Sequence, residues 1–178
     1  MNGNHVSLRA LEPEDVEILY HWENDRNIWH LSNTITPLSR FNLEQYILNA
    51  GNDIYATKQL RLMIDLIVPQ DEIKTIGSID LFEYDPVHLR AGVGILIHER
   101  FRGRGYASEA LGLLIAYARE TLQLHQLFAN ISPDNGDSIR LFEKKGFRYI
   151  GTKKDWNRIR NKWHDENMFQ FILQPDKS

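Results

Sequence analysis

The segment between Arg90 and Leu122 constrains the fold of this chain more than any other stretch. It reads RAGVGILIHERFRGRGYASEALGLLIAYARETL, in which an apolar strand pattern over residues 90–98 leads into a glycine-rich loop. From Tyr106 onward, apolar residues recur on nearly every side of the helix that the spacing predicts, so this helix should be buried on most sides. Gly92 and Gly94 lie within the strand, where glycine often marks a bulge or the close approach of a ligand.

The loop has the chemistry of an anion site. Gly103 and Gly105 carry no side chains, so backbone N–H groups can approach a ligand there, and a helix begins directly afterwards. A helix N-terminus carries about half a positive charge and several N–H groups that lack intrahelical partners. Arg102 and Arg104 add full positive charges. A phosphate or pyrophosphate is the expected guest, although two alternating glycines alone also fit a tight turn with solvated arginines.

Two common phosphate-binding loops do not fit this segment. A nucleoside-triphosphate loop would end in lysine followed by serine or threonine, and that ending is missing. A dinucleotide-binding loop would place a third glycine where Ser108 stands, and an acidic residue about twenty positions further on. It would also lie near the start of the domain.

The rest of the chain predicts a mixed architecture. Alternating or apolar stretches predict further strands at residues 6–10, 61–68, 74–83, 127–131, 149–152 and 168–173. Helical spacing and capping residues predict helices at 11–22, 38–50, 106–122 and 138–147. The charged segment 155–167, DWNRIRNKWHDEN, is interpreted as the connection between the last two strands. Elements in this order indicate an α+β fold.

Composition narrows the class of protein. A length of 178 residues favours a single domain, residues 1–178, over two. The formal net charge of −3 argues against a dedicated nucleic-acid binder. Cysteine is absent, which excludes disulfides, thiolate metal ligands and a cysteine nucleophile. The seven histidines show no metal-ligand spacing and no apolar run is long enough for a membrane span, so we expect a cytoplasmic protein without a metal site.

Two separated segments carry a family resemblance. Residues 102–107, RGRGYA, resemble the Gln/Arg-x-x-Gly-x-Gly/Ala signature of the GCN5-related N-acetyltransferase (GNAT) superfamily. Residues 135–147, NGDSIRLFEKKGF, are similar to that family's Asn-x-x-Ser/Ala-x-x-Leu-Tyr-x-Lys-x-Gly-Phe element. From Val6 to Leu173 the order of elements resembles the branch that contains the ribosomal-protein alanine and spermidine acetyltransferases. The resemblance implies a mostly antiparallel sheet flanked by helices and splayed in the middle for acetyl-CoA.

The resemblance also implies which residues hold acetyl-CoA. Residues 98–107 are expected to wrap the pyrophosphate, and residues 95–97 to pair with the pantetheine arm. The Ile97 N–H is the candidate for polarising the thioester carbonyl. Asn135 is expected to contact pantetheine, with Ser138 assisting. The cofactor residues expected by position are therefore Ile95, Leu96, Ile97, His98, Arg102, Gly103, Arg104, Gly105, Tyr106, Ala107, Asn135 and Ser138.

The sequence departs from the family pattern at two catalytic positions. Phe142 stands where many relatives carry a tyrosine that protonates the departing thiolate. Gly92 stands where related enzymes often carry a strand glutamate. Asp80, in GSIDLF, is the nearest acidic match for a general base acting through a water chain. Its alternative is a strand aspartate that faces solvent or pairs with an arginine.

The resemblance implies direct attack by a primary amine on the thioester in a ternary complex, with a monomer or homodimer as the working unit. Without the usual tyrosine acid and strand glutamate, the site is better matched to a protein or peptide α-amine. Its pKa of ~8 makes deprotonation easier than for a lysine-like amine. A small-molecule amine (polyamine, aminoglycoside or amino acid) is the second candidate, and a non-catalytic acyl-CoA-binding domain is the third. Glu23 and Asp25 are candidates for a cation-attracting rim, and Trp156 and Trp163 for the outer wall of the acceptor site.

Overall fold

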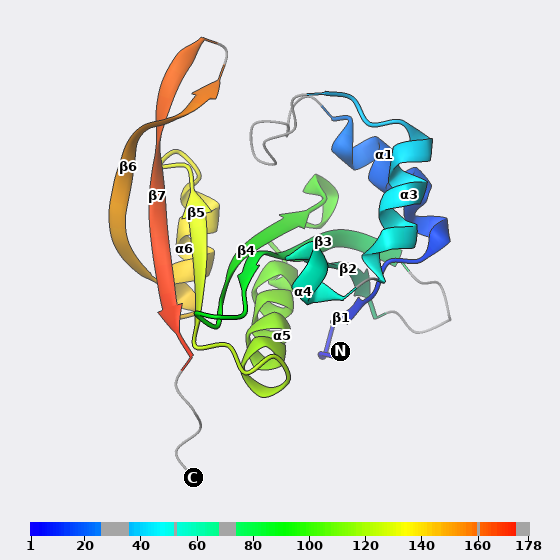
Figure 1. Cartoon of the computed structure of the whole chain (residues 1–178), viewed down its shortest axis with the longest axis horizontal. Helices are drawn as coiled ribbons and strands as arrows, with labels where there is room; N and C mark the ends of the chain where they lie inside the picture. Colours follow the sequence, from blue (N-terminus) through cyan, green and yellow to red (C-terminus); the bar gives the residue numbers. More distant parts are fainter. Residues whose placement is uncertain (26–35, 52, 68–73, 160, 174–178) are drawn as a thin grey trace.

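A seven-stranded sheet forms the centre of the protein (Figure 1). The computed structural model describes residues 1–25, 36–51, 53–67, 74–159 and 161–173. The strand order is β1-β2-β3-β4-β5-β7-β6. The strands are β1 (Val6–Arg9), β2 (Leu60–Leu66), β3 (Lys74–Asp85), β4 (Arg90–Ile97), β5 (Gln126–Ile131), β6 (Arg148–Ile159) and β7 (Lys162–Ile172). All neighbouring pairs are antiparallel except β4 and β5, which are parallel, so the mostly antiparallel α+β expectation is confirmed.

Strands β4 and β5 pair over a short stretch and then separate. Their register joins residues 90–92 of β4 to residues 126–128 of β5. Beyond these residues β4 continues to Ile97 and β5 to Ile131 without further pairing to each other. Figure 1 shows the two strands diverging toward the end at which the β6–β7 hairpin projects. The splay expected in the middle of the sheet is therefore present.

The helices cover the sheet in two groups. They are η1 (Pro13–Asp15), α1 (Val16–Glu23), α3 (Arg40–Ala50), α4 (Ile54–Thr57), η2 (Glu99–Phe101), α5 (Tyr106–Glu120) and α6 (Gly136–Lys144). Helix α5 contributes Leu111 and Leu114 to the main core, where they are fully buried with Leu81 and Ile79 of β3. Helices α1 and α3 pack on each other beyond β2 and share a second apolar cluster around Met63. Among the helices that the structure describes, none is long and apolar enough to cross a membrane.

The interpretation of residues 155–167 as a connection is wrong. Most of them extend β6 and β7 into a long hairpin, in which Asn157 pairs with His164 and Arg158 with Trp163. The pairing is irregular between Lys153 and Asn157, and Asp155 has a positive φ of 46°. An irregularity of this kind interrupts the period of two that marks a strand. The described residues of this segment are exposed or half-buried and none is buried, so the sequence shows no alternation of buried and exposed positions there.

Candidate active site

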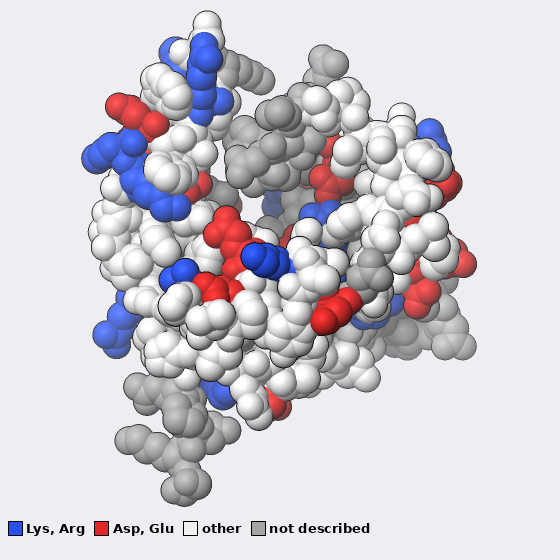
Figure 2. All heavy atoms as spheres, in the orientation of Figure 1, with Lys and Arg blue, Asp and Glu red and all other residues white. Residues whose placement is uncertain are grey.

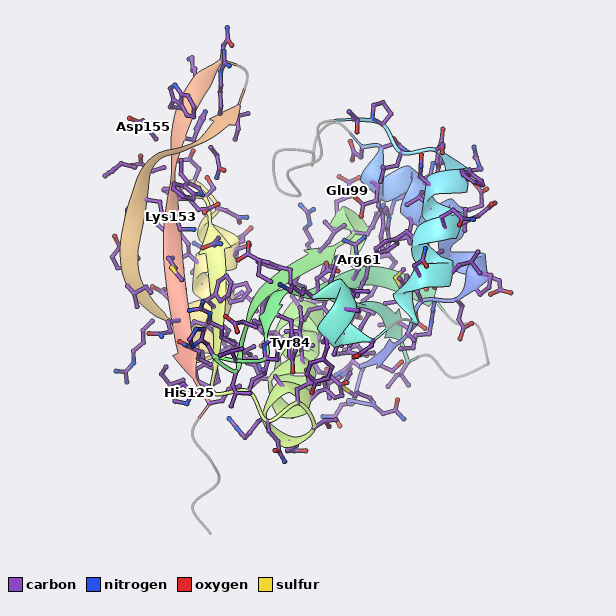
Figure 3. All side chains as sticks on the ribbon, viewed as in Figure 1. Arg61, Tyr84, Glu99, His125, Lys153 and Asp155 are labelled. Carbon is purple, nitrogen blue, oxygen red and sulfur yellow. The ribbon has the colours of Figure 1, made fainter. Side chains whose placement is uncertain are left out.

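A cleft of about 1330 Å³ opens at the divergence of β4 and β5. Its lining includes residues of β3, β4 and β5, the start of α6, the β6–β7 hairpin and the end of α1. In Figure 2, acidic and basic side chains both gather around the hollow near the centre of this face. Figure 3 shows Arg61 and Lys153 on opposite sides of it.

The glycine loop has a backbone that suits a close anion. Gly103 and Gly105 have φ values of +74° and +85°, a region that favours glycine over residues with a Cβ. A Cβ added at either position would meet no described atom within 4 Å, so the space above the loop is open. Gly105 is the N-cap of α5 and supplies no side-chain cap to the first turn of the helix. These features fit a pyrophosphate bound by backbone N–H groups.

The side chains around the loop stabilise its shape. Arg102 donates from Nε to the carbonyl oxygen of Ile97 at 2.9 Å, which ties the loop back to the end of β4. His98 accepts the Arg100 N–H at Nδ1 over 3.4 Å, at the start of η2. The Arg104 guanidinium lies 5.9 Å from the centre of the Phe101 ring. Tyr106 and Ala107 pack against the main core. The polar contacts of Arg102 and His98 are therefore structural contacts of the loop, which the sequence did not predict.

The edge of β4 that faces the splay presents backbone groups to the cleft. The His98 N–H donates to the Ile76 carbonyl at 2.8 Å, while Ile97 lies opposite Gly77 in the register. In an antiparallel ladder this makes Ile97 and Gly77 a non-hydrogen-bonded pair, so the Ile97 N–H points away from β3. The same alternation turns the Ile95 N–H toward the splay. Both N–H groups therefore point away from β3, although of these two residues only Ile95 is among those that line the cleft. Their roles as pantetheine and carbonyl donors stay predictions.

On the opposite side of the splay, α6 supplies the second predicted segment. Asn135 is the N-cap of α6, and its side-chain oxygen accepts the Ser138 N–H at 3.2 Å. Asn135, Ser138 and Phe142 all line the cleft. Phe142 is only 3% exposed, and its ring packs edge-on against Phe147 with centroids 4.9 Å apart. The family's tyrosine position is therefore occupied by an apolar packing residue.

Asp80 and Glu23 meet through a residue that the sequence analysis did not single out. Arg61, on β2, donates from Nε to Asp80 Oδ1 and from Nη1 to Glu23 Oε1, each at 2.6 Å. All three side chains are 16% exposed. Burial raises the pKa of Asp80 above its ordinary value, although the Arg61 charge opposes that change. Asp80 thus lies in the cleft wall and pairs with an arginine, as the structural alternative expected, and its role as general base stays a prediction.

The hairpin side of the cleft holds a second ion pair. Lys153 donates to Glu166 Oε2 at 2.9 Å and to Asn130 Oδ1 at 3.1 Å. Asn157 donates to the other oxygen of Glu166 at 2.9 Å. The Lys153 ammonium also lies 4.9 Å from the centre of the Trp156 ring, within reach of a cation–π contact. This wall therefore offers polar groups, one aromatic ring and a paired cation.

In the part of the chain that the structure describes, only two of the four predicted acceptor-binding residues line the cleft. Glu23 and Trp156 line the cleft, whereas Asp25 and Trp163 are not among the lining residues of the described ranges. Trp163 is 60% exposed on the hairpin. Within the same ranges, no three His, Asp or Glu side chains form a group that could hold a metal ion.

The Phe82 ring accounts for the glycine at position 92. Gly92 lies opposite Phe82 in the β3–β4 register, and a Cβ on Gly92 would overlap the Phe82 ring. Phe82 packs edge-on against Phe128 of β5 at a centroid distance of 5.7 Å. The space that a side chain at position 92 would need is therefore filled by the Phe82 ring.

This contact predicts a difference between two neighbouring glycines. We expect Gly92→Ala to lower the free energy of unfolding by about 1–3 kcal/mol, because the added methyl group overpacks the Phe82 ring. Gly94→Ala is the matched control on the same strand, since its Cβ would lie 3.8 Å from Phe82 in ordinary contact. Chemical denaturation of both variants measures the difference. Equal stability of the two variants would contradict this account.

Glu109 anchors the N-terminal residues to the start of α5. Its carboxylate accepts the N–H groups of Asn4, His5 and Val6, and the His5 ring nitrogen Nδ1 lies 3.0 Å from Oε2. Burial alone would raise the pKa of Glu109, but these N–H donors and the His5 ring lower it below the ordinary value. Glu109 follows the glycine loop by one helical turn, so it fixes the helix end on which the loop depends.

We expect Glu109→Gln to lower the melting temperature in a pH-dependent way. The loss of a charged acceptor should cost about 1–3 kcal/mol, or roughly 2–4 °C per kcal/mol in a domain of this size. Because the folded pKa is lowered, the stabilisation is complete above the ordinary value of 4.5 and is lost as the pH falls through the folded pKa. Melting curves should therefore converge in acid. Glu120→Gln, at the exposed end of the same helix, is the control, and a difference independent of pH would refute the role of the charge.

Comparisons with known proteins agree with this geometry. Residues 5–148 match the model of the family described as Acetyltransferase (GNAT) domain. The uncharacterized N-acetyltransferase p20 of Bacillus licheniformis is 27% identical over 167 residues, which cover 94% of this chain and 92% of that protein. The spermidine N(1)-acetyltransferase of Vibrio cholerae is 24% identical over 175 residues, covering 97% and 95%. A crystal structure of V. cholerae spermidine N-acetyltransferase with CoA and spermine superposes with a TM-score of 0.84 at 23% identity, covering 94% of this chain and 95% of that one.

The family match spans most of the chain and includes the glycine loop, the splayed strands and α6. The fold of the solved neighbour is the same. The chain belongs to the GNAT acetyltransferase family and is an N-acetyltransferase that uses acetyl-CoA as its co-substrate.

Proposed function

We propose that the chain acetylates a small, positively charged primary amine of the polyamine class. The observation that carries this proposal is the charge of the cleft, whose described lining has six carboxylates and four basic side chains. The carboxylates belong to Glu23, Asp80, Glu83, Asp85, Asp165 and Glu166, and the basic groups to Lys58, Arg61, Arg90 and Lys153. An excess of negative charge in a concave site concentrates cationic ligands.

The relatives support a small amine more than the protein or peptide α-amine favoured by the sequence analysis. Two relatives named spermidine N(1)-acetyltransferase, from V. cholerae and Escherichia coli, are 24% and 26% identical to this chain. The expected monomer or homodimer stays a prediction, because one structure of the V. cholerae enzyme is dodecameric. Light scattering of the purified protein would determine the assembly.

The proposed chemistry uses groups of β3 and β4. The acceptor nitrogen forms the C–N bond with its lone pair, and the C–S bond breaks with its electrons left on sulfur. We assign the carbonyl contact to the Ile97 N–H, and the proton lost by nitrogen passes through water to Asp80. Phe142 has no proton to give, so the sulfur takes its proton from solvent. A thiol pKa of about 8.5 makes the thiolate a tolerable leaving group without help.

A panel of acceptors tests this function. CoA release would be measured with acetyl-CoA and spermidine, an aminoglycoside, or a lysine-free peptide with a free N-terminus. We expect the highest kcat/KM for spermidine, and a decrease with added salt because charge attraction is screened. A higher kcat/KM for the peptide would restore the α-amine hypothesis. Tight CoA binding without acceptor-dependent release would identify a non-catalytic acyl-CoA-binding domain.

A further inference from the structure

Arg61 lies between the carboxylates of Glu23 and Asp80, on the α1 side of the cleft. In the sheet register Arg61 is directly opposite Asp80, and Asp80 is directly opposite Gly94 on β4. The guanidinium therefore occupies the β2 side of Asp80. The face of the Tyr46 ring, from α3, lies 5.5 Å from the guanidinium carbon.

The β4 side of Asp80 is left open by glycine. A Cβ at Gly94 would have Phe82 as its nearest described neighbour, at 3.8 Å, so no side chain fills that space closely. Asp80 and Gly94 both line the cleft. An acceptor amine can therefore approach the Asp80 carboxylate over Gly94, with Arg61 on the far side of the same carboxylate.

This arrangement affects the protonation state of the acceptor, for which binding and reaction have opposite requirements. The acceptor is attracted as an ammonium ion, but only the deprotonated amine has a lone pair for the thioester carbon. Nearby carboxylates favour the ammonium form, and a nearby cation favours the neutral amine. Arg61 remains a cation here, because Asp80, Tyr46 and Glu23 raise its pKa although burial alone would lower it.

We propose that Arg61 is a positioning residue that sets the protonation state of the bound acceptor, by weakening the hold of Asp80 and Glu23 on the ammonium ion. This inference rests on the proposed cationic acceptor. The described groups that face Arg61 are Glu23 from α1, Tyr46 from α3 and Asp80 from β3. The proton that leaves the amine goes to water or to Asp80, and the amine then attacks.

The test is the split between kcat and KM in Arg61→Gln. Without the cation, we expect the pKa of the bound amine to rise by about one unit. At neutral pH the ammonium form then binds about tenfold more tightly, and the fraction of bound amine that is deprotonated falls about tenfold. The acceptor KM and kcat should both fall about tenfold at neutral pH, while kcat/KM stays within a few-fold of wild type. The kcat–pH profile should move about one unit toward alkaline pH, with full kcat recovered there. Arg61→Lys should restore the wild-type values.

A merely structural role would give a different result. If Arg61→Gln raises the acceptor KM while kcat falls, or leaves the pH profile in place, the inference is wrong. Glu23→Gln provides a second variant with the opposite expectation, since it removes a carboxylate: KM should rise and the kcat profile should move toward acid. If Arg61→Gln does not fold, that variant decides the question.

The outcomes also separate this inference from the proposed function. The Arg61 variants are measured with whichever amine the wild-type enzyme acetylates best, so a preference for peptides overturns the polyamine proposal alone. If no amine is acetylated, calorimetry with spermidine at neutral pH replaces kinetics. Tighter binding by Arg61→Gln than by wild type supports the inference, and equal or weaker binding overturns it.

Discussion

Replacing Gly105 should raise the KM for acetyl-CoA by about tenfold for alanine and more than about 100-fold for valine. Gly105 has a φ of +85°, and a left-handed conformation costs an L-residue roughly 1–2 kcal/mol, with β-branched residues the least tolerant. The added side chain also enters the open space above the loop, where the pyrophosphate must approach the N–H groups of α5. Steady-state kinetics and CoA calorimetry measure the loss, and Gly103→Ala should act in the same direction.

Two comparisons make this prediction specific to the loop. Gly51→Ala is the matched control, since Gly51 has an ordinary φ of −76° and nothing within 4 Å of an added Cβ. The second comparison uses an acetyl thioester that lacks the pyrophosphate, such as S-acetylpantetheine. Wild type and Gly105→Val should use this donor equally well. An equal loss with the truncated donor would mean that the substitution damages the catalytic end of the cleft instead.

The features of this site that could be predicted from the sequence are formed by residues close together in the chain. The glycine loop and α5 are adjacent, so the turn residues, the helix start and the apolar helix could be read together. The N-terminal cap of α6 lies within four residues, from Asn135 to Ser138, in a loop whose helix-capping residues could be recognised from the sequence. Each feature depends on short-range rules of backbone geometry.

The parts that were missed depend on pairing between distant segments. The contact of Arg61 with Asp80 requires the β2–β3 register, and the contact with Glu23 requires the packing of α1 against the sheet. A lone arginine inside the apolar strand LRLMIDL was the available signal, because a buried charge needs a partner. Lys153 and Glu166 were hidden in the same way, by a hairpin that was not recognised. Sequence alone named Asp80 and Glu23 separately, for two different roles, without the residue that joins them.

Asp80→Asn should reduce kcat/KM for the acceptor by about 100-fold or more, the usual range for loss of a general base. Asparagine keeps the shape of the side chain but can neither take a proton nor attract an ammonium ion. The pH profile gives an independent reading. Burial raises the pKa of Asp80, so wild-type activity should fall with decreasing pH at values above the ordinary aspartate range. Asp80→Asn should lose the part of this acid limb that protonation of Asp80 causes, and keep the part that protonation of the acceptor amine causes.

The matched control is Asp65→Asn, which breaks a similar contact outside the cleft lining. Asp65, also on the sheet, accepts Arg9 Nε at 2.6 Å and is 5% exposed. Loss of either aspartate disturbs a buried arginine pair, but Arg9 keeps its contact with Asp15 and Arg61 keeps its contact with Glu23. The cost should therefore lie below the roughly 3–5 kcal/mol of an uncompensated buried charge. Asp65→Asn should therefore lower the melting temperature while the folded enzyme keeps its kcat/KM and its acid limb. If both variants lose activity in proportion to their stability, Asp80 stabilises the fold and takes no part in the proton transfer.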